Sequence, residues 1–236
     1  MKTVRDIERN NKSVILRCDF NVPVENGVIK DNSKIKKSLK TINYLLEHNC
    51  KIIILSHFGR VKTENDRNNN SLKVVGKELS DLLQKEVVFI DNCYGSKVKE
   101  IVDNYSLGSV ILLENTRFMD LYDKKESNND LSLASYWASL GDVYVNDAFG
   151  SLHRAHASTA GIAKYLPHVI GFLVEEELQN LDILIHDTPH PFCVFMGGAK
   201  VDDKLPIIES LLKRCDYLLV GGGIANSFLK AKGASI

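Results

Sequence analysis

Charged and polar side chains stand at the ends of several short apolar runs, where they could form a binding site. The first run ends in Asp19 and Asn21, and three later runs are each followed by an arginine. The full set is Asp19, Asn21, His57, Arg60, Arg117, His153, Arg154 and His156. Arginine binds carboxylate and phosphate groups through paired hydrogen bonds. If the runs are parallel strands, their carboxyl ends share one edge of a sheet, where a small ligand with two anionic ends could bind. The alternative is that each arginine pairs with a neighbouring Asp or Glu.

Two glycine-rich turns follow the last two apolar runs. The first places Gly197 and Gly198 before Lys200 and Lys204, and the second is Gly221–Gly223. Glycines between a strand and a helix let backbone N–H groups approach a phosphate, and the start of the helix adds positive potential. Neither turn has a Walker A or dinucleotide-binding pattern, and each could be purely structural. Beside an arginine-lined anion site, the two turns indicate phosphoryl transfer between an acceptor and a nucleotide.

Other catalytic arrangements find less support in the residues. His153 and His156 have a spacing that metal ligands can have, but no third ligand is evident nearby, and no metal site is predicted. The chain contains no Gly-x-Ser-x-Gly motif, and no cysteine has a local histidine partner. Tyr136 and Trp137 fall in a helical stretch and are expected to lie in the core.

The elements that would position these residues alternate along the chain. Short β-branched runs predict strands at 14–20, 51–55, 86–90, 109–113, 142–145, 192–196 and 217–220. Helical periodicity begins near Ser33 and covers about 72–84, 96–105, 130–140, 172–185, 204–213 and 225–230. The strand runs are continuously apolar, which is typical of parallel strands buried on both faces. We therefore predict an α/β fold with a doubly wound, Rossmann-like parallel sheet.

The sequence also predicts a division into domains. Residues 1–170 form an N-terminal lobe, 171–190 a hinge helix and linker, and 191–236 the opening of a second α/β lobe. Pro189 and Pro191 end the hinge helix. The last segment is too short for an ordinary α/β domain, so the second lobe is expected to be partial.

Composition narrows the possible functions. The 236 residues contain 30 Lys+Arg and 30 Asp+Glu, and 44% of them are hydrophobic. A neutral globular chain has no overall electrostatic attraction for nucleic acid or membranes, and no apolar run approaches the ~20 residues of a membrane span. The first 100 residues carry 19 Lys+Arg against 13 Asp+Glu, or +6, which leaves −6 for the rest and favours anion binding by the first half. The charged N-terminus and five dispersed cysteines predict a cytoplasmic chain without a disulfide framework.

Six motifs in a fixed order resemble phosphoglycerate kinase. They are RCDFNVP (17–23), LSHFGR (55–60), LLENTRF (112–118), VNDAFGSLHRAHAS (145–158), GGAKVDDK (197–204) and GGGIANSF (221–228). The resemblance implies a monomeric glycolytic enzyme with two α/β lobes that close about a hinge. Its reaction would be reversible phosphoryl transfer between 1,3-bisphosphoglycerate and ADP, which gives 3-phosphoglycerate and ATP, with Mg²⁺ accompanying the nucleotide.

The resemblance also implies which residues form the two halves of the site. Substrate-binding residues would be Asp19, Phe20, Asn21, Lys34, His57, Phe58, Gly59, Arg60, Arg117 and Arg154. Nucleotide-binding residues would be Gly198, Lys200, Lys204, Gly221, Gly222 and Gly223. Lys34 and Lys200 would be the catalytic residues, because both would support the phosphoryl group during transfer.

Two departures from the family pattern bear on activity. Lys34 stands where the family has an arginine, so the charge is kept and the planar fork is lost. Lys36 or Lys37 could compensate, or Lys34 could simply lie on the solvent face of its helix. Family members also continue well beyond residue 236, into the part that supplies the metal ligand. The chain is therefore expected to be a fragment, a truncated form or a shortened paralogue with at most half of a nucleotide site. The alternative function is a catalytically inactive lobe that binds a small anion or a partner.

Overall fold

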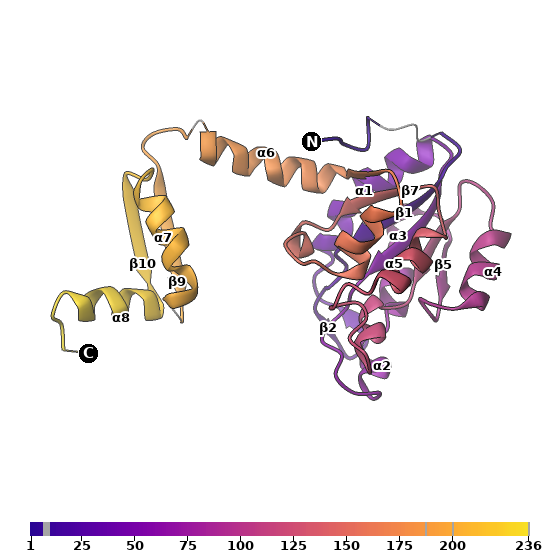
Figure 1. The fold of residues 1–236 in the computed structure, drawn as a ribbon, viewed down its shortest axis with the longest axis horizontal. Coiled ribbons are helices and arrows are strands. Elements are labelled where there is room, and N and C mark those ends of the chain that lie inside the picture. The colour runs from indigo at the N-terminus through magenta and orange to yellow at the C-terminus, as the bar shows by residue number, and fades with distance from the viewer. Residues whose placement is uncertain (7–9, 187, 200, 236) are drawn as a thin grey trace. The chain divides into compact units, whose positions relative to one another are not determined.

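The computed structural model describes residues 1–236 except 7–9, 187, 200 and 236, and it divides the chain into two compact units (Figure 1). Unit 1 comprises Met1–Glu177 and unit 2 comprises Leu178–Ile236. The boundary between them falls inside helix α6 (Phe172–His186). The finer assignment of 1–170, 171–190 and 191–236 as lobe, hinge and partial lobe stays a prediction. Within the described part of the chain, no helix is long and apolar enough to cross a membrane.

Unit 1 is built on a six-stranded sheet in which every pair of neighbouring strands is parallel. The strands are β1 (Ser13–Cys18), β4 (Lys51–Ser56), β5 (Val87–Ile90), β6 (Val110–Leu113), β7 (Val143–Asp147) and β8 (His168–Ile170), in the order β5-β6-β4-β1-β7-β8. Every residue of β4, β6 and β7 is buried. The prediction of a parallel sheet is therefore confirmed, and burial on both faces holds for β4, β6 and β7, whereas the edge strands β5 and β8 are partly exposed.

Helices cover both faces of the sheet because adjacent residues of a strand point to opposite sides. The helices of unit 1 are α1 (Ser33–Glu47), α2 (Asp66–Asn69), α3 (Lys73–Leu83), α4 (Ser96–Asn104), α5 (Leu131–Ala138) and the first part of α6. Leu16 of β1 packs in one apolar cluster with residues of α1 and α3, whereas Ile15 packs in a second cluster with residues of α4 and α5. Trp137 is fully buried in the second cluster, as predicted, and its indole Nε1 donates to Cys93 O at 2.7 Å.

Several short elements of unit 1 were not predicted. β2 (Val24–Glu25) and β3 (Val28–Ile29) form a hairpin around Asn26 and Gly27, whose φ angles of 51° and 75° suit the Asn-Gly turn. β8 was missed because three residues carry too little periodicity, and α2 is a single turn in a stretch expected to be loop. Short 3₁₀ or π segments follow several strands: η1 (Thr116–Asp120), η2 (Phe149–Ser151), η3 (Ala157–Gly161) and η4 (Ile162–Lys164).

Unit 2 contains two parallel strands, β9 (Cys193–Gly198) and β10 (Tyr217–Gly221). Its other elements are the 3₁₀ turn η5 (Asp202–Lys204), α7 (Leu205–Leu212) and α8 (Gly222–Ala231). Burial alternates along both strands, and Phe195 and Tyr217 are 77% and 63% exposed. The prediction that these two strands are buried on both faces is therefore wrong for the unit described here, because only one face of this small sheet is covered.

Candidate functional site

A cavity of about 420 Å³ lies where the carboxyl ends of the central strands of unit 1 meet. Its lining residues are Asn21, His57, Gly59, Arg60, Val61, Lys62, Arg117 and Arg154. They come from four different segments, which follow β1, β4, β6 and β7. The parallel order brings these segments together, since all four strands end at the same edge. Six of the eight residues were predicted to bind substrate, and Val61 and Lys62 were not.

Positive charge is concentrated in the cavity, which three arginines line. Within the described residues, no ion pair joins Arg60, Arg117 or Arg154 to a carboxylate, so the alternative that each arginine pairs with a neighbour is not observed. Arg117 Nε is also buried without a hydrogen-bond partner there. Burial and the nearby Arg154 lower the pKa of Arg117, which is the mark of cations crowded together. An anion bound among these side chains would relieve that repulsion.

His57 lines the cavity and has 8% of its surface exposed. Its Nδ1 atom lies 3.1 Å from Nη2 of Arg17, a residue of β1 that is completely buried. Burial, followed by the charge of Arg17, lowers the pKa of His57 to about 3. The imidazole is therefore neutral at ordinary pH.

Asp19 and Lys34 form an ion pair beside the cavity. Lys34 Nζ lies 3.0 Å from Asp19 Oδ2, and the backbone N–H of Asn21 donates to Asp19 Oδ1 at 3.1 Å. Although burial acts in the opposite direction, the Lys34 ammonium and the backbone N–H of Asn21 lower the pKa of Asp19. Lys34 is thus held by a carboxylate next to the predicted binding residues.

The loops around the cavity are fixed by Asn115, which sequence reasoning missed. This side chain is fully buried; its Oδ1 accepts from the backbone N–H groups of Phe58 and Arg117, at 3.1 and 3.0 Å. Its Nδ2 donates to Phe58 O at 2.7 Å and Asn70 O at 2.9 Å. The backbone N–H of Gly59 donates to Asn21 Oδ1 at 2.9 Å, and the φ of Gly59 is +60°. These bonds tie the segments after β1, β4 and β6 into one frame.

Phe20 and Phe58, which the resemblance assigned to the substrate, do not line this cavity. Their exposed fractions are 0% and 5%, and both pack in the apolar cluster that contains α1 and α3. They anchor the loops in the core, whereas Asn21 and His57 beside them line the cavity. A phenylalanine next to a polar binding residue is a signal for such an anchor, because the two side chains point in different directions.

The glycine-rich turns of unit 2 lie side by side. Gly198 and Gly222 form a parallel β-bridge, and a Cβ atom added to Gly223 would lie 2.5 Å from Ala199 O, so only glycine fits there. A Cβ atom on Gly198 would lie 2.9 Å from Lys204 Cε, which places the Lys204 side chain against the first turn. Lys200 is outside the described residues. The two glycine-rich turns and Lys204 are therefore adjacent. A phosphate site in this segment requires such an arrangement.

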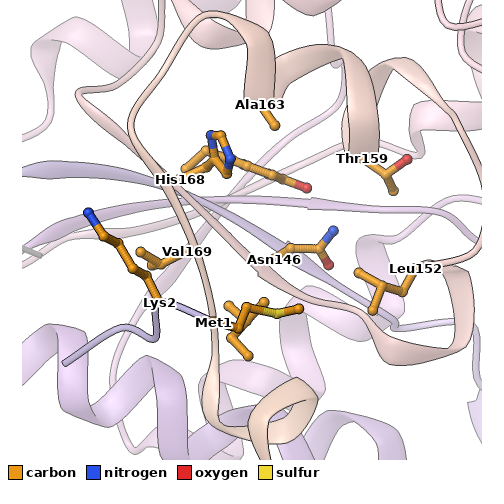
Figure 2. Close-up of a pocket in the computed structure, with 10 residues that line it drawn as sticks. Met1, Lys2, Asn146, Leu152, Thr159, Ala163, His168 and Val169 are labelled. Carbon is orange, nitrogen blue, oxygen red and sulfur yellow. The ribbon is translucent and has the colours of Figure 1, made fainter. Parts of the chain in front are cut away.

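Figure 2 shows a second cavity of unit 1, of about 410 Å³, beside the edge strand β8. Residues that line it include Met1, Asn146, Leu152, Ala163 and Val169. Most of this surface is apolar, and it contains no cluster of cations among the residues described. It therefore lacks the anion-binding character of the arginine-lined cavity.

The histidines that could have bound a metal are used differently. His156 Nδ1 lies 3.8 Å from Glu126 Oε1, and burial with the nearby Arg117 and Arg154 lowers the pKa of His156 to about 4. His153 is exposed, and its Nε2 accepts from Arg154 Nε at 3.4 Å. Among the residues that the structure describes, no group of three His, Cys, Asp or Glu side chains could hold a metal ion.

A parallel α/β sheet with a cationic cavity at its strand ends is typical of the class of proteins that bind small anionic metabolites. The sequence profile of the family described as "Phosphoglycerate kinase" matches residues 4–236, and the chain belongs to this family. The resemblance noted in the six motifs is thereby confirmed.

Relatives and solved structures agree with this assignment. A phosphoglycerate kinase of Mycoplasma genitalium is 52% identical over 241 residues, which cover 98% of this chain and 59% of that protein. One of Fusobacterium nucleatum is 49% identical over 238 residues, which cover 100% of this chain and 60% of that protein. The structure of phosphoglycerate kinase from Coxiella burnetii matches with a TM-score of 0.83 and 38% identity, over 99% of this chain and 57% of that one. That from Pyrococcus horikoshii matches with a TM-score of 0.87 and 32% identity, over 100% and 58%. The chain thus spans about 60% of the length of the curated relatives it matches.

Proposed function

We propose that this chain is part of an enzyme that transfers a phosphoryl group between 1,3-bisphosphoglycerate and ADP. The bond from the acyl oxygen of 1,3-bisphosphoglycerate to phosphorus breaks, and a bond from the β-phosphate oxygen of ADP to that phosphorus forms. The products are 3-phosphoglycerate, with a free carboxylate, and ATP. The same groups serve the reverse reaction.

The observation that carries this proposal is the cationic cavity of unit 1. A molecule of 3-phosphoglycerate has a carboxylate at one end and a phosphate at the other, and both groups suit guanidinium donors. Arg60, Arg117 and Arg154 supply these donors, and each is free of a competing carboxylate within the described residues. Asn21 and His57 add neutral polar groups that can bind the hydroxyl or carboxylate oxygens. We assign these five residues to 3-phosphoglycerate.

We assign the charge of Lys34 and Lys200 to the phosphoryl group during transfer. Phosphoryl transfer needs little covalent chemistry from the protein, so its rate depends on positioning and on neutralising the oxygens that carry charge. Lys34 is held by Asp19 at 3.0 Å, which keeps the ammonium near the binding residues when no phosphoryl group is present. Lys204 and the turns containing Gly198 and Gly221–Gly223 would receive the phosphates of ATP or ADP.

Mg²⁺ is expected to accompany the nucleotide. The described residues contain no group of three side chains that fits a metal ion, so this chain's own residues are not assigned to it and no step is derived through it. We further propose a monomer that works in the cytoplasm; its five cysteines are free, as expected in a reducing compartment.

Calorimetric titration of the 236-residue chain with 3-phosphoglycerate tests the proposal. Because unit 1 contains the whole cationic cavity, we expect saturable binding at low ionic strength that weakens as salt is added. Arg154→Gln should weaken binding by about 10-fold or more, since a hydrogen bond from a charged group is worth about 1.5–3 kcal/mol. Arg214→Gln, at an exposed position of unit 2, is the matched control and should bind as the wild type does. Heats equal to dilution at millimolar ligand in a folded sample would refute the assignment.

A further inference from the structure

A row of buried polar side chains lies behind the cationic cavity of unit 1. Arg17, Glu126 and Ser158 each have 0% of their surface exposed, and His57 joins the row to the cavity. Burying polar and charged groups costs free energy unless each of them has a hydrogen-bond or ion-pair partner. The groups in this row must therefore bind one another. Of these four side chains, only His57 has a role in the function proposed above.

Glu126 and Arg17 are connected through one hydroxyl group. The backbone N–H of Ser158 donates to Glu126 Oε2 at 2.9 Å, and the Ser158 hydroxyl donates to Glu126 Oε1. The same hydroxyl oxygen accepts from Arg17 Nε at 2.9 Å. The Ser158 hydroxyl therefore bridges the buried guanidinium of Arg17 and the carboxylate of Glu126, which is the counterion of Arg17.

The other end of Arg17 determines the proton arrangement of His57. Arg17 Nη2 lies 3.1 Å from His57 Nδ1, and a guanidinium nitrogen can only donate a hydrogen bond. Nδ1 must therefore accept, so it carries no proton. The neutral ring then has its single proton on Nε2, and Nε2–H is its only N–H donor.

We propose that Glu126 and Ser158 are positioning residues that hold Arg17 against His57 Nδ1, so that His57 presents Nε2–H to an anionic oxygen in the cavity. This inference rests on the proposed function, which supplies the oxygen as that of 3-phosphoglycerate. A neutral donor adds a directed hydrogen bond without adding a further cation to a crowded cluster. The protonation state of His57 also stays unchanged across the physiological pH range, because the imidazole has to lose its hydrogen bond from Arg17 before it can gain a second proton.

The charged groups that face His57 support this arrangement. They are Arg17 from β1, Asp19 after β1, Arg117 from η1 and Arg154 after η2. Three of the four are cations and oppose a second proton on the ring. Asp19 favours that proton and raises the pKa of His57, but its carboxylate is paired with Lys34, and the cations and burial outweigh it. The tautomer of His57 thus depends chiefly on where Arg17 is held.

The test is ¹⁵N NMR of the histidine side chains in the 236-residue chain, with His57→Asn used to assign the His57 signals. Protonated and unprotonated ring nitrogens have well-separated ¹⁵N shifts, so the spectrum reports the tautomer directly. In the wild type we expect an unprotonated Nδ1 and a protonated Nε2 from pH 5 to 8. In Ser158→Ala and Glu126→Gln we expect Nδ1 to become partly protonated, because the remaining bond from Arg17 Nη1 to Cys18 O does not by itself hold Nη2 against Nδ1. Both variants should also bind 3-phosphoglycerate about 10-fold more weakly in calorimetry.

Ser151→Ala is the matched control, because Ser151 is a buried serine of η2 whose hydroxyl donates to Ala148 O at 3.3 Å and, within the described residues, forms no hydrogen bond with Arg17 or Glu126. It should keep the wild-type tautomer and affinity. A wild-type His57 with its proton on Nδ1 would overturn the proposal without any variant. A wild-type tautomer retained in folded Ser158→Ala and Glu126→Gln would overturn it as well. The NMR signature needs no ligand, so a chain that fails to bind 3-phosphoglycerate but shows the expected tautomer shift would refute the proposed substrate and leave the positioning role standing.

Discussion

Lowering the pH from 7 to 5 should reduce the unfolding free energy of the chain by about 2 kcal/mol through His57 alone. The pKa of this histidine is about 3 in the folded chain against an ordinary value of 6.5. Above pH 6.5 the ring is neutral in both states and contributes nothing. As the pH falls below 6.5, the unfolded chain binds a proton that the folded chain does not, and stability is lost until the pH approaches 3. One pKa unit corresponds to about 1.4 kcal/mol, so the fall from 6.5 to 5 gives about 2 kcal/mol.

The perturbation that isolates this effect is His57→Asn. An asparagine side chain can place its amide oxygen near the position of Nδ1, where it accepts from Arg17, and it does not titrate. Ionisable groups elsewhere contribute to both proteins and cancel in the difference. The wild type should therefore lose about 2 kcal/mol more than His57→Asn between pH 7 and pH 5.

Urea unfolding followed by tryptophan fluorescence measures this difference in unit 1 specifically, because the single tryptophan, Trp137, is buried in the core of that unit. His168→Asn is a control at an exposed histidine of the same unit and should follow the wild type. Equal losses of stability for the wild type and His57→Asn would show that His57 is not held neutral by its surroundings, and the reasoning from burial and Arg17 would fail.

Three further predictions concern the transferring group, the nucleotide and the packing of unit 1. The first prediction concerns a chain extended by the C-terminal part of a relative. There Lys34→Ala should lower kcat by about 10-fold or more and Lys34→Arg should not lower it, because the charge of Lys34 acts mainly in the transition state. An unchanged kcat in the alanine variant would show that Lys34 is not a catalytic residue. The 236-residue chain should bind ADP weakly or not at all in equilibrium dialysis, since a few phosphate contacts do not offset the cost of ordering the nucleotide; micromolar binding would contradict this. Gly171→Ala should destabilise unit 1 by about 1–3 kcal/mol in urea, because its Cβ would lie 2.3 Å from Asp147 Oδ1, which accepts from the backbone N–H groups of Leu173 and Val174 in α6. Gly76→Ala, where the added Cβ meets only ordinary contacts, is the control for that substitution and should not destabilise.

Local patterns predicted the sheet of unit 1 well. Continuous runs such as Lys51–Ser56 and Val143–Asp147 are buried throughout, and only a strand covered on both faces needs that composition. The Asn26-Gly27 turn was a readable signal that was not used, since both residues have the positive φ that such hairpins require. The last two strands were misjudged because burial depends on the elements packed against a strand, and the sequence of a strand does not contain them.

The cationic cavity was predictable for a topological reason. Arg60, Arg117 and Arg154 each follow a strand, and in a parallel sheet the carboxyl ends of strands share an edge, so separate positions along the chain become neighbours. Residue type and position relative to a strand were sufficient for that inference. Phe20 and Phe58 were assigned to the substrate by the family resemblance and not by this reasoning; their side chains pack in the core, and their assignment stays a prediction.

What the sequence determined by itself is the class of fold, the family and the residues that carry charge to the strand ends, because these depend on composition, order and local periodicity. What only the tertiary structure decided is which polar groups meet behind that edge. Glu126 and Ser158 lie 32 residues apart, and Arg17 lies 141 residues from Ser158. No local pattern marks such residues, since a buried hydrogen bond depends on the distance and direction between two side chains, and those exist only after the sheet has brought the segments together.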